Sequence, residues 1–281
     1  MEARPVLETA LFAALLLASA SVFWLRFSRV LGIIRGSRPD EGFIPGHWPA
    51  RLARFVSEVL FQSKVIRRRP LPGLAHAFVF WGFLAFALAT LNHLAHGFHF
   101  SLFDPRGSFG RMYANLAFVF AIFVAISITG LALRRLIARP RWLGERISWE
   151  SILIALLILT LMLTYLAEHQ TGSTPLLWWT HTLALLVFLP LIPRTKHLHL
   201  VLSPLTVLLK QPVFAHLPPL RGDEVFGLDT GRDVPRRLAL QAFSCVECGR
   251  CQQHCPAHNT GKLLNPKEIA LGLRSYLNEH G

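Results

Sequence analysis

Five long apolar stretches constrain this chain more than any other feature of its sequence. A helix that crosses the hydrocarbon core of a bilayer needs about 20 predominantly apolar residues. One such stretch could be a buried helix of a soluble protein, but five of them before residue 197 argue against that alternative. The sequence therefore predicts an all-α membrane protein. Its transmembrane helices are expected at about residues 6–26, 73–95, 112–134, 150–168 and 175–196.

The composition agrees with this interpretation. Only 16% of the residues are charged, whereas soluble proteins average about 25%, and the mean hydropathy is +0.42. The net charge of +13 is also typical of proteins that bind nucleic acid. Here, however, the basic residues lie in loops between the apolar stretches and are not interleaved with aromatic residues, so we expect no nucleic-acid partner.

The basic residues also predict an orientation in the membrane, because loops rich in Lys and Arg remain in the cytoplasm. Between the first two spans lie Arg26, Arg29, Arg35, Arg38, Arg51, Arg54, Lys64, Arg67, Arg68 and Arg69. Between the third and fourth spans lie Arg134, Arg135, Arg139, Arg141 and Arg146. The opposite side has Arg4, Arg106 and Arg111. We therefore expect the N-terminus outside and the chain after the fifth span in the cytoplasm.

The sequence also predicts three domains. Apolar residues recur at helical spacing between positions 49 and 66, which indicates an amphipathic helix on the inner membrane surface. A short helix in a soluble loop is the alternative for that segment. Residues 1–210 are expected to form the membrane domain. Prolines and glycines indicate a linker at 211–234, and 235–281 form a cytoplasmic segment.

All four cysteines lie in the last segment, at Cys245, Cys248, Cys251 and Cys255. The C-x2-C-x2-C-x3-C-P spacing is that of bacterial ferredoxins, in which thiolates hold an iron–sulfur cluster. Gly249 permits a sharp turn inside the run, and Pro256 stops the chain from continuing it. A structural zinc site is the alternative, but zinc sites usually divide their ligands into two separated pairs. The spacing therefore favours a [4Fe-4S] cluster.

A single cysteine run is half of what two-cluster ferredoxins contain. In those proteins the fourth cysteine of each run binds the other cluster, so either all four cysteines close on one cluster or another run completes the module. The sequence also predicts a last helix at 266–277, with a proline at its first position. Its apolar face (Ile269, Leu273 and Leu277) is expected to lack packing partners. We therefore expect a truncated chain or one that needs a partner subunit.

Histidines in or beside the apolar stretches are the second group of candidate ligands. An ionisable side chain in lipid is costly and indicates a functional site. His93 and His181 lie near the outer ends of the second and fifth spans, and His76 lies near the inner end of the second. His197 and His199 follow the inner end of the fifth. Pairs at matching depth on facing helices could hold two b-type haems, each with two axial histidines.

Helical phase selects among the histidines that follow the fifth span. His181 and His199 are eighteen positions apart, which is five full turns at 3.6 residues per turn. By the same geometry, His197 points about 160° away from His181. Phase therefore favours His199, provided that Pro190 and Pro193 do not bend the helix.

Phase is less selective on the second span. His93 is about 100° and His96 about 200° out of phase with His76, so His96 fits worse and is expected to lie in the outer interface. Trp178 and Trp179 are expected to form an aromatic belt at the same interface.

Two segments resemble known families. The segment from Gly73 to Phe83, with His76 at its fourth position, resembles the haem-binding second span of the respiratory nitrate reductase gamma-subunit superfamily. The segment from Phe243 to Lys267 resembles membrane iron–sulfur oxidoreductases related to heterodisulfide reductase. That group includes the membrane electron-transfer-flavoprotein:menaquinone oxidoreductases. The family also places five spans before a ferredoxin run, so the resemblance covers nearly the whole chain.

The resemblance implies a five-transmembrane-helix b-haem bundle in the bacterial cytoplasmic membrane, followed by a small ferredoxin-like [4Fe-4S] segment. It assigns axial ligation of two haem b groups to His76, His93, His181 and His199. It assigns ligation of the [4Fe-4S] cluster to Cys245, Cys248, Cys251 and Cys255. The second ferredoxin run and the cysteine-rich C-terminal domains of the family are not found in this sequence. The oxidation site of the donor is therefore expected in a second Fe–S subunit or in a missing C-terminal domain.

Two functional hypotheses follow. In the first, the chain is a quinone-linked oxidoreductase or its electron-transfer subunit. It passes electrons between a cytoplasmic donor, such as electron-transfer flavoprotein, and a quinone such as menaquinone. An inner haem (His76 and His199) and an outer haem (His93 and His181) would lie on that route. In the second hypothesis the chain is a non-catalytic membrane anchor or a redox-sensing subunit that docks an Fe–S partner, and its histidines are structural.

Overall fold

The computed structural model of the protein describes residues 6–40, 46–104, 107–138, 148–210 and 230–280. Every regular element in these ranges is helical, which confirms the predicted all-α class. The described residues form two compact units. The first unit contains residues 6–23, 62–104, 107–138 and 148–191, and the second contains 24–40, 46–61, 192–210 and 230–280. Most of the predicted linker, at 211–229, lies outside the described residues.

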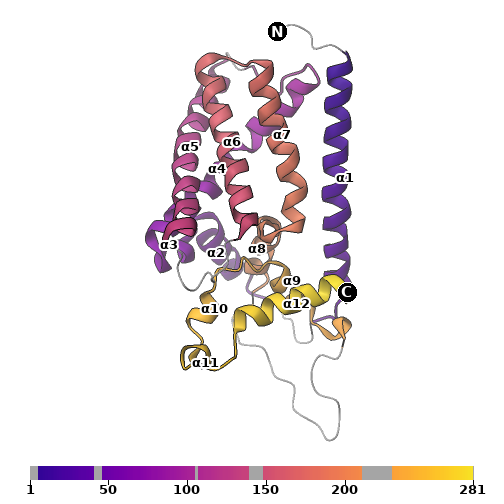
Figure 1. Cartoon of the computed structure of the whole chain (residues 1–281), viewed down its shortest axis with the longest axis vertical. Helices are drawn as coiled ribbons and strands as arrows, with labels where there is room; N and C mark the ends of the chain where they lie inside the picture. The colour runs from indigo at the N-terminus through magenta and orange to yellow at the C-terminus, as the bar shows by residue number, and fades with distance from the viewer. Residues whose placement is uncertain (1–5, 41–45, 105–106, 139–147, 211–229, 281) are drawn as a thin grey trace, which may run out of the picture. The chain divides into compact units, whose positions relative to one another are not determined.

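Within the described ranges, five helices are long and apolar enough to cross a membrane, as the sequence predicts. They are α1 (Val6–Gly36), α4 (Pro70–Gly97), α5 (Ser108–Leu133), α6 (Trp149–Thr171) and α7 (Pro175–Leu191) (Figure 1). A π-helical turn, η2 (Arg134–Ala138), extends α5. The main difference from the prediction is α1, which continues about ten residues past the expected end at 26 and ends at Gly36.

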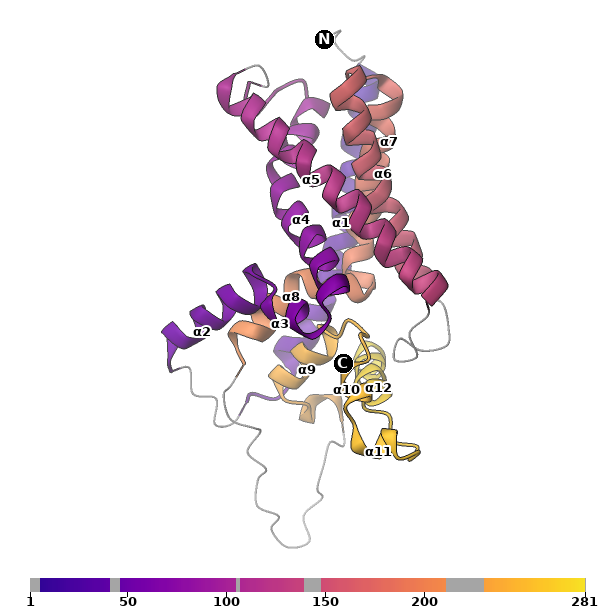
Figure 2. The same cartoon turned by 90° about the vertical axis from the view of Figure 1, so that its left-hand side faces the viewer.

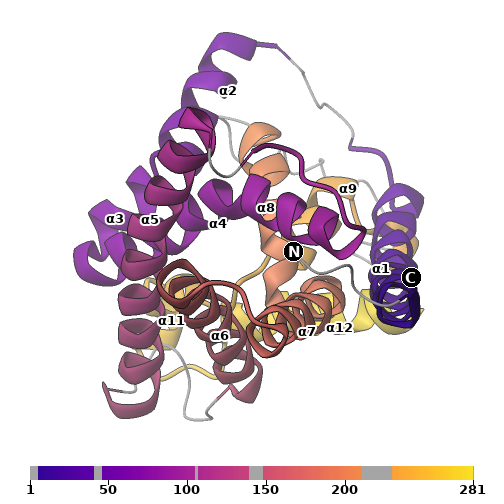
Figure 3. The same ribbon diagram turned by 90° about the horizontal axis from the view of Figure 1, so that it is seen from above.

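The first unit is a bundle in which successive helices contact each other, α4 with α5, α5 with α6 and α6 with α7 (Figures 1 and 3). Small residues permit the close contacts. Gly82 of α4 lies against Val124 of α5, where an added Cβ would meet the valine methyl at 2.2 Å. The core between these helices contains Phe86, Ala117, Ala121, Val124, Leu161, Met162 and Ala184. This packing places the inward residues of α4 and α7 in the same bundle.

The first part of α1 joins the bundle through contacts with α4 and α7. Phe12 is completely buried, and its ring lies where a Cβ on Gly97 of α4 would clash. The Ser19 hydroxyl donates a 2.7 Å hydrogen bond to the Leu186 carbonyl of α7. Such contacts between small or hydroxyl side chains and a neighbouring backbone are typical of helices that associate in lipid, where there is no hydrophobic drive to bring them together.

The predicted amphipathic helix between 49 and 66 is interrupted. It consists of α2 (Trp48–Phe55), the π-helical turn η1 (Val56–Leu60) and α3 (Ser63–Arg68). The break falls at Gln62, which has a left-handed φ of 51°. In the second unit, the buried Arg51 donates hydrogen bonds to the carbonyls of Leu208 and Lys210, which hold α2 against α8.

The second unit contains the chain after α7. Besides α2, η1 and the end of α1, its helices are α8 (His199–Leu208), α9 (Arg236–Phe243), α10 (Arg250–Gln253), α11 (Pro256–Asn259) and α12 (Pro266–His280). Short 3-10 turns precede them: η4 (Ile192–Arg194), η5 (Lys196–Leu198) and η6 (Gly231–Asp233). Figure 2 shows α9 beside α8 and α12 beside α10, as their contacts also indicate. The core contains Val30, Ile33, Leu198, Leu202, Val234, Ala239, Leu240, Ala242, Phe243 and Leu277.

The expectation that the last helix lacks packing partners is wrong for two of its three apolar residues. Leu277 is completely buried in the core of the second unit, and Leu273 packs against the same core. Only Ile269 is exposed, at 59%. The partners come from α1, α8 and α9, which are far away in the sequence, so spacing within the helix alone could not indicate them.

Truncation of Leu277 is predicted to destabilise the second unit. Leu277→Ala should lower the free energy of unfolding by about 2–5 kcal/mol, since it removes a buried side chain and leaves a cavity. Ile269→Ala, on the exposed face of the same helix, should change it by less than about 0.5 kcal/mol. Thermal unfolding of the detergent-solubilised protein measures both. Equal melting temperatures for the two variants would contradict the packing described above.

Candidate functional site

Two predicted ligands, His93 and His181, meet inside the first unit. His93 comes from α4 and His181 from α7, and their ring centroids are 4.6 Å apart. His181 is 7% exposed. The two residues are 88 positions apart in the sequence, and the fold of the bundle brings them into contact. The bundle therefore places two imidazoles from different helices together, which is the donor set of a bis-histidine haem site.

Two threonines orient these imidazoles. The Thr164 hydroxyl of α6 lies 2.7 Å from Nδ1 of His181. The same hydroxyl donates a 2.8 Å hydrogen bond to the Thr160 carbonyl. Thr182 lies 2.9 Å from Nε2 of His93. The contact at Nδ1 of His181 fixes that ring and leaves its Nε2 for a metal, as is typical of metal-binding histidines. Nε2 of His181 is therefore the ring nitrogen that could bind a metal. Sequence analysis missed both threonines, whose only signal is a hydroxyl in an apolar helix.

Trp178 belongs to the same cluster, so the predicted aromatic belt is wrong for this residue. It is 3% exposed, it stacks on His93 with ring centroids 5.2 Å apart and an interplanar angle of 19°, and Phe12 packs on its edge. Trp179 is half-buried and donates a 2.7 Å hydrogen bond to the Glu8 carboxylate. Both tryptophans therefore contact polar or aromatic partners within the bundle.

His96 occupies a different environment from His93. Its Nε2 lies 2.9 Å from the Ser101 hydroxyl and 3.2 Å from the Asn92 amide. His99 lies 2.8 Å from the Thr9 hydroxyl and is exposed. The helix end at Gly97 thus has its own polar network. Of the two candidates on α4, His93 is the one that reaches His181.

The phase argument for His199 fails, because α7 does not continue to it. The helix ends at Leu191, a 3-10 turn follows, and the extended backbone of Thr195 begins a second turn. His199 is nevertheless suited to a metal. Its Nδ1 lies 2.7 Å from the Lys196 carbonyl, and such a contact at one ring nitrogen is typical of metal-binding histidines. Burial lowers its pKa and so favours the neutral imidazole that binds metals.

His197 and His76, the other two histidines considered as ligands of the inner haem, lie in surroundings that differ from those of His199. His197 precedes α8, and its Nδ1 lies 3.2 Å from the Thr195 hydroxyl. His76 lies on α4 in the first unit and is half-buried. His199 belongs to the second unit. The pairing of His76 with His199 stays a prediction.

The imidazole pair fits a haem in its chemistry but not in its present spacing. Each metal–nitrogen bond is about 2 Å long, so two axial rings on one iron lie farther apart than the 4.6 Å between the ring centroids of His93 and His181. A haem between them requires the rings to separate. The contact of Thr164 with Nδ1 of His181 and the stacking of Trp178 on His93 are both compatible with a bound haem.

The cysteine run forms a loop with two short helical turns in the second unit. Cys245 follows α9, Cys251 lies in α10, and Cys255 precedes α11. The chain turns sharply at Glu247 and Gly249, whose φ angles are 58° and 70°. Gly249 therefore has the role that the sequence predicts for it, because a left-handed backbone suits glycine.

The four thiols have the chemistry of an iron–sulfur site, since they are soft ligands on a single loop with ferredoxin spacing. Cys251 is exposed and the other three are half-buried. In the part of the chain that the structure describes, no three His, Cys, Asp or Glu side chains gather closely enough to hold a metal ion. Burial raises the pKa of the Cys245 thiol, so cluster binding would have to displace its proton.

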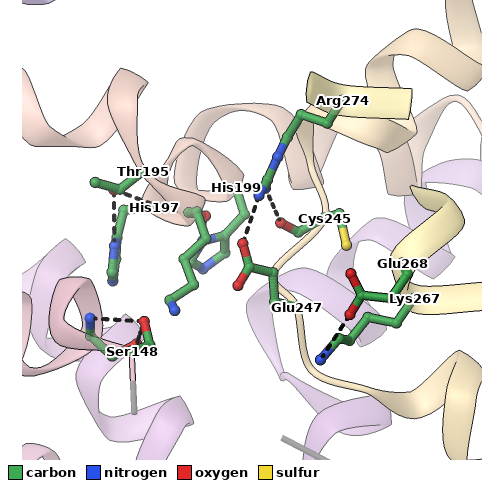
Figure 4. Close-up of polar contacts among 11 residues, drawn as sticks. Ser148, Thr195, His197, His199, Cys245, Glu247, Lys267, Glu268 and Arg274 are labelled. Carbon is green, nitrogen blue, oxygen red and sulfur yellow. Dashed lines mark hydrogen bonds and ion pairs between the residues drawn. The ribbon is translucent and has the colours of Figure 1, made fainter. Parts of the chain in front are cut away.

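Residues of α12 hold the start of this loop (Figure 4). Arg274 donates one hydrogen bond to the Cys245 carbonyl, at 3.1 Å, and another to the Glu247 carboxylate, at 2.6 Å. Burial opposes ionisation of Glu247, but the Arg274 hydrogen bond and the charges of Lys196, Arg274 and Lys267 outweigh it and lower the pKa of this carboxyl. Sequence analysis missed Arg274.

Comparisons with known proteins agree with the cysteine motif. The chain is 29% identical to "EtfAB:quinone oxidoreductase" of Syntrophomonas wolfei, over 73% of this chain and 35% of that protein. It is 28% identical to "Probable iron-sulfur-binding oxidoreductase FadF" of Bacillus subtilis, over 82% of this chain and 38% of that protein. The chain thus spans somewhat over a third of the length of these curated relatives.

No family model and no solved structure matches the chain. The two curated matches nevertheless cover most of the chain, and both are named as oxidoreductases. They confirm the resemblance to that group of iron–sulfur oxidoreductases, to which the chain is similar over most of its length.

Proposed function

We propose that the protein is a membrane-bound electron-transfer subunit that connects a cytoplasmic donor with the quinone pool. The observation that carries this proposal is the contact between His93 and His181 inside a bundle of membrane-length helices, in a chain that also has a ferredoxin cysteine run. Imidazole and thiolate sites in one membrane protein support a redox role more than a purely structural one.

The proposed cofactors are one [4Fe-4S] cluster and two haem b groups. When bound, they supply one-electron transfer, and the protein supplies binding, orientation and electrostatics. Cys245, Cys248, Cys251 and Cys255 would hold the cluster. His93 and His181 would hold the outer haem, with Thr164 and Thr182 setting the orientation of their rings. His76 and His199 remain candidate ligands of the second haem on the sequence evidence.

The proposed partners follow from the relatives and from charge. The name of the Syntrophomonas protein contains both EtfAB and quinone, which supports electron-transfer flavoprotein as donor and a quinone such as menaquinone as acceptor. The relatives are much longer than the matched region. We therefore place the oxidation of the donor in a second Fe–S subunit or in a further C-terminal domain.

The proposed location is the bacterial cytoplasmic membrane, with the N-terminus outside and the cysteine loop in the cytoplasm. Basic loops support this orientation, because Lys and Arg flank spans on the cytoplasmic side. The same charges would attract an acidic donor. An anchor or redox-sensing subunit is the alternative, in which the histidines would only contribute to folding.

A comparison of two histidines on α4 distinguishes these functions. His93→Ala should reduce the haem b content of purified protein by about half, because one of two proposed haems loses an axial ligand. His96→Ala, one turn away, should leave it unchanged. The pyridine haemochrome spectrum measures haem per chain. Equal haem content in both variants and the wild type would favour the anchor alternative.

A further inference from the structure

The backbone between the first two cysteines of the run is held in an unfavourable conformation. Glu247 lies between Cys245 and Cys248 and has a φ of 58°. This left-handed region is uncommon for residues other than glycine, and asparagine or aspartate are the usual exceptions. Such a conformation persists where surrounding contacts impose it. The contacts at Glu247 therefore determine how Cys245 and Cys248 are placed relative to each other.

Arg274 provides these contacts from α12, twenty-nine positions after Cys245. Its two terminal nitrogens divide between the Cys245 carbonyl (3.1 Å) and the Glu247 carboxylate (2.6 Å), as Figure 4 shows. The guanidinium is planar and holds both partners in a fixed relation. Arg274 is half-buried, as is Glu247, so the ion pair is partly shielded from water.

Two lysines add positive charge to the same region. Lys196 and Lys267 are each 9% exposed, which is unusual for lysine. The charges of both act on Glu247. Lys267 also approaches Glu268 at 3.8 Å, but the Glu268 side chain is 62% exposed and so is well solvated. Three cations thus face the carboxylates of Glu247 and Glu268, and Arg250 adds a further positive charge within the run itself. The surroundings of the loop are therefore net positive.

A cluster held by four thiolates becomes more negative when it accepts an electron, without any bond being formed or broken. Nearby positive charge stabilises the reduced form and raises the reduction potential, since net charge, hydrogen bonding and exposure set the potentials of such clusters. Removal of a cation from this loop should lower the potential, and removal of an anion should raise it.

We infer that Arg274 is a positioning residue for the cluster, which fixes the turn between Cys245 and Cys248 and raises the reduction potential. This inference rests on the proposed function, because it requires the [4Fe-4S] cluster. The opposite charges of Arg274 and Glu247 make it testable, since the two residues form one ion pair but should shift the potential in opposite directions.

The test is an anaerobic redox titration of the purified full chain, monitored by electron paramagnetic resonance of the reduced cluster. At the wild-type midpoint, Arg274→Gln should lower the ratio of reduced to oxidised cluster about tenfold, which corresponds to about 59 mV for one electron. Glu247→Gln should raise that ratio. Arg274→Lys keeps the charge and should stay closer to the wild type than Arg274→Gln.

Arg237→Gln is the matched control. Arg237 also belongs to the second unit and forms an ion pair, but its partner is Asp40, at 3.0 Å. Its loss should leave the potential unchanged. If Arg274→Gln loses the cluster altogether, the positioning role is supported and the direction of the Glu247→Gln shift decides the electrostatic role.

Two outcomes would overturn the inference. One is an unchanged midpoint in a fully loaded Arg274→Gln protein, and the other is a lower midpoint in Glu247→Gln. A wild-type protein with no iron–sulfur signal would instead contradict the proposed function itself.

Discussion

Replacement of Cys251 by alanine is expected to abolish the iron–sulfur signal of the protein. Removal of one of four thiolate ligands leaves an iron without its protein ligand, and the exposed position of Cys251 gives water access to that site. Acid-labile sulfide should fall from about four per chain, the content of one [4Fe-4S] cluster, to near zero. Sulfide is the appropriate measure because haem contains none.

Gln253→Ala is the control for this experiment. Gln253 is exposed and lies two positions after Cys251 in the same short helix, α10, so the variant tests whether any change in the loop removes the cluster. Its sulfide content should equal that of the wild type. Full sulfide content in Cys251→Ala would contradict the assignment of this residue as a cluster ligand.

Replacement of His181 by alanine should remove the outer haem and with it most quinone reduction. His181 is buried and meets His93, so its loss leaves one imidazole where two are proposed. Haem b per chain should fall by about half. The rate at which a quinone reoxidises the reduced protein, followed by stopped-flow absorbance, should fall at least about tenfold, because a site in the chain of cofactors is lost.

Thr164→Val provides a graded version of the same experiment. It keeps the shape of the side chain and removes the hydroxyl that lies 2.7 Å from Nδ1 of His181. Loss of such a partner typically weakens metal binding about 10–100-fold. We therefore expect partial haem loss, between that of the wild type and that of His181→Ala. The same rate in all three proteins would contradict the role of His181.

The five spans were predictable because apolar length is a local property of the sequence. The end of α1 was not. Residues 27–36 include charged positions, yet they continue the helix because Val30 and Ile33 pack in the core of the second unit. Packing against elements that are distant in the sequence determines where α1 ends, so the spacing of residues within the segment could not predict it.

The sequence indicates the candidate ligands of the site but not the residues that surround them. His93, His181 and the cysteines are chemically distinctive at their positions. Trp178 is apolar, like exposed residues of the same helix such as Leu176 and Leu183, so only the fold shows that it stacks on His93. Arg274 is likewise one basic residue among many, and only the fold of α12 brings it to Glu247.

The most direct test of the account is the optical spectrum of the purified chain under anaerobic conditions. Dithionite should produce the absorption bands of reduced haem b, and a menaquinone analogue added afterwards should reverse them. This result is expected because the oriented pair of His93 and His181 is proposed to hold a haem in contact with the quinone pool. A dithionite-reduced sample without b-type bands would contradict the proposal that the chain binds haem b.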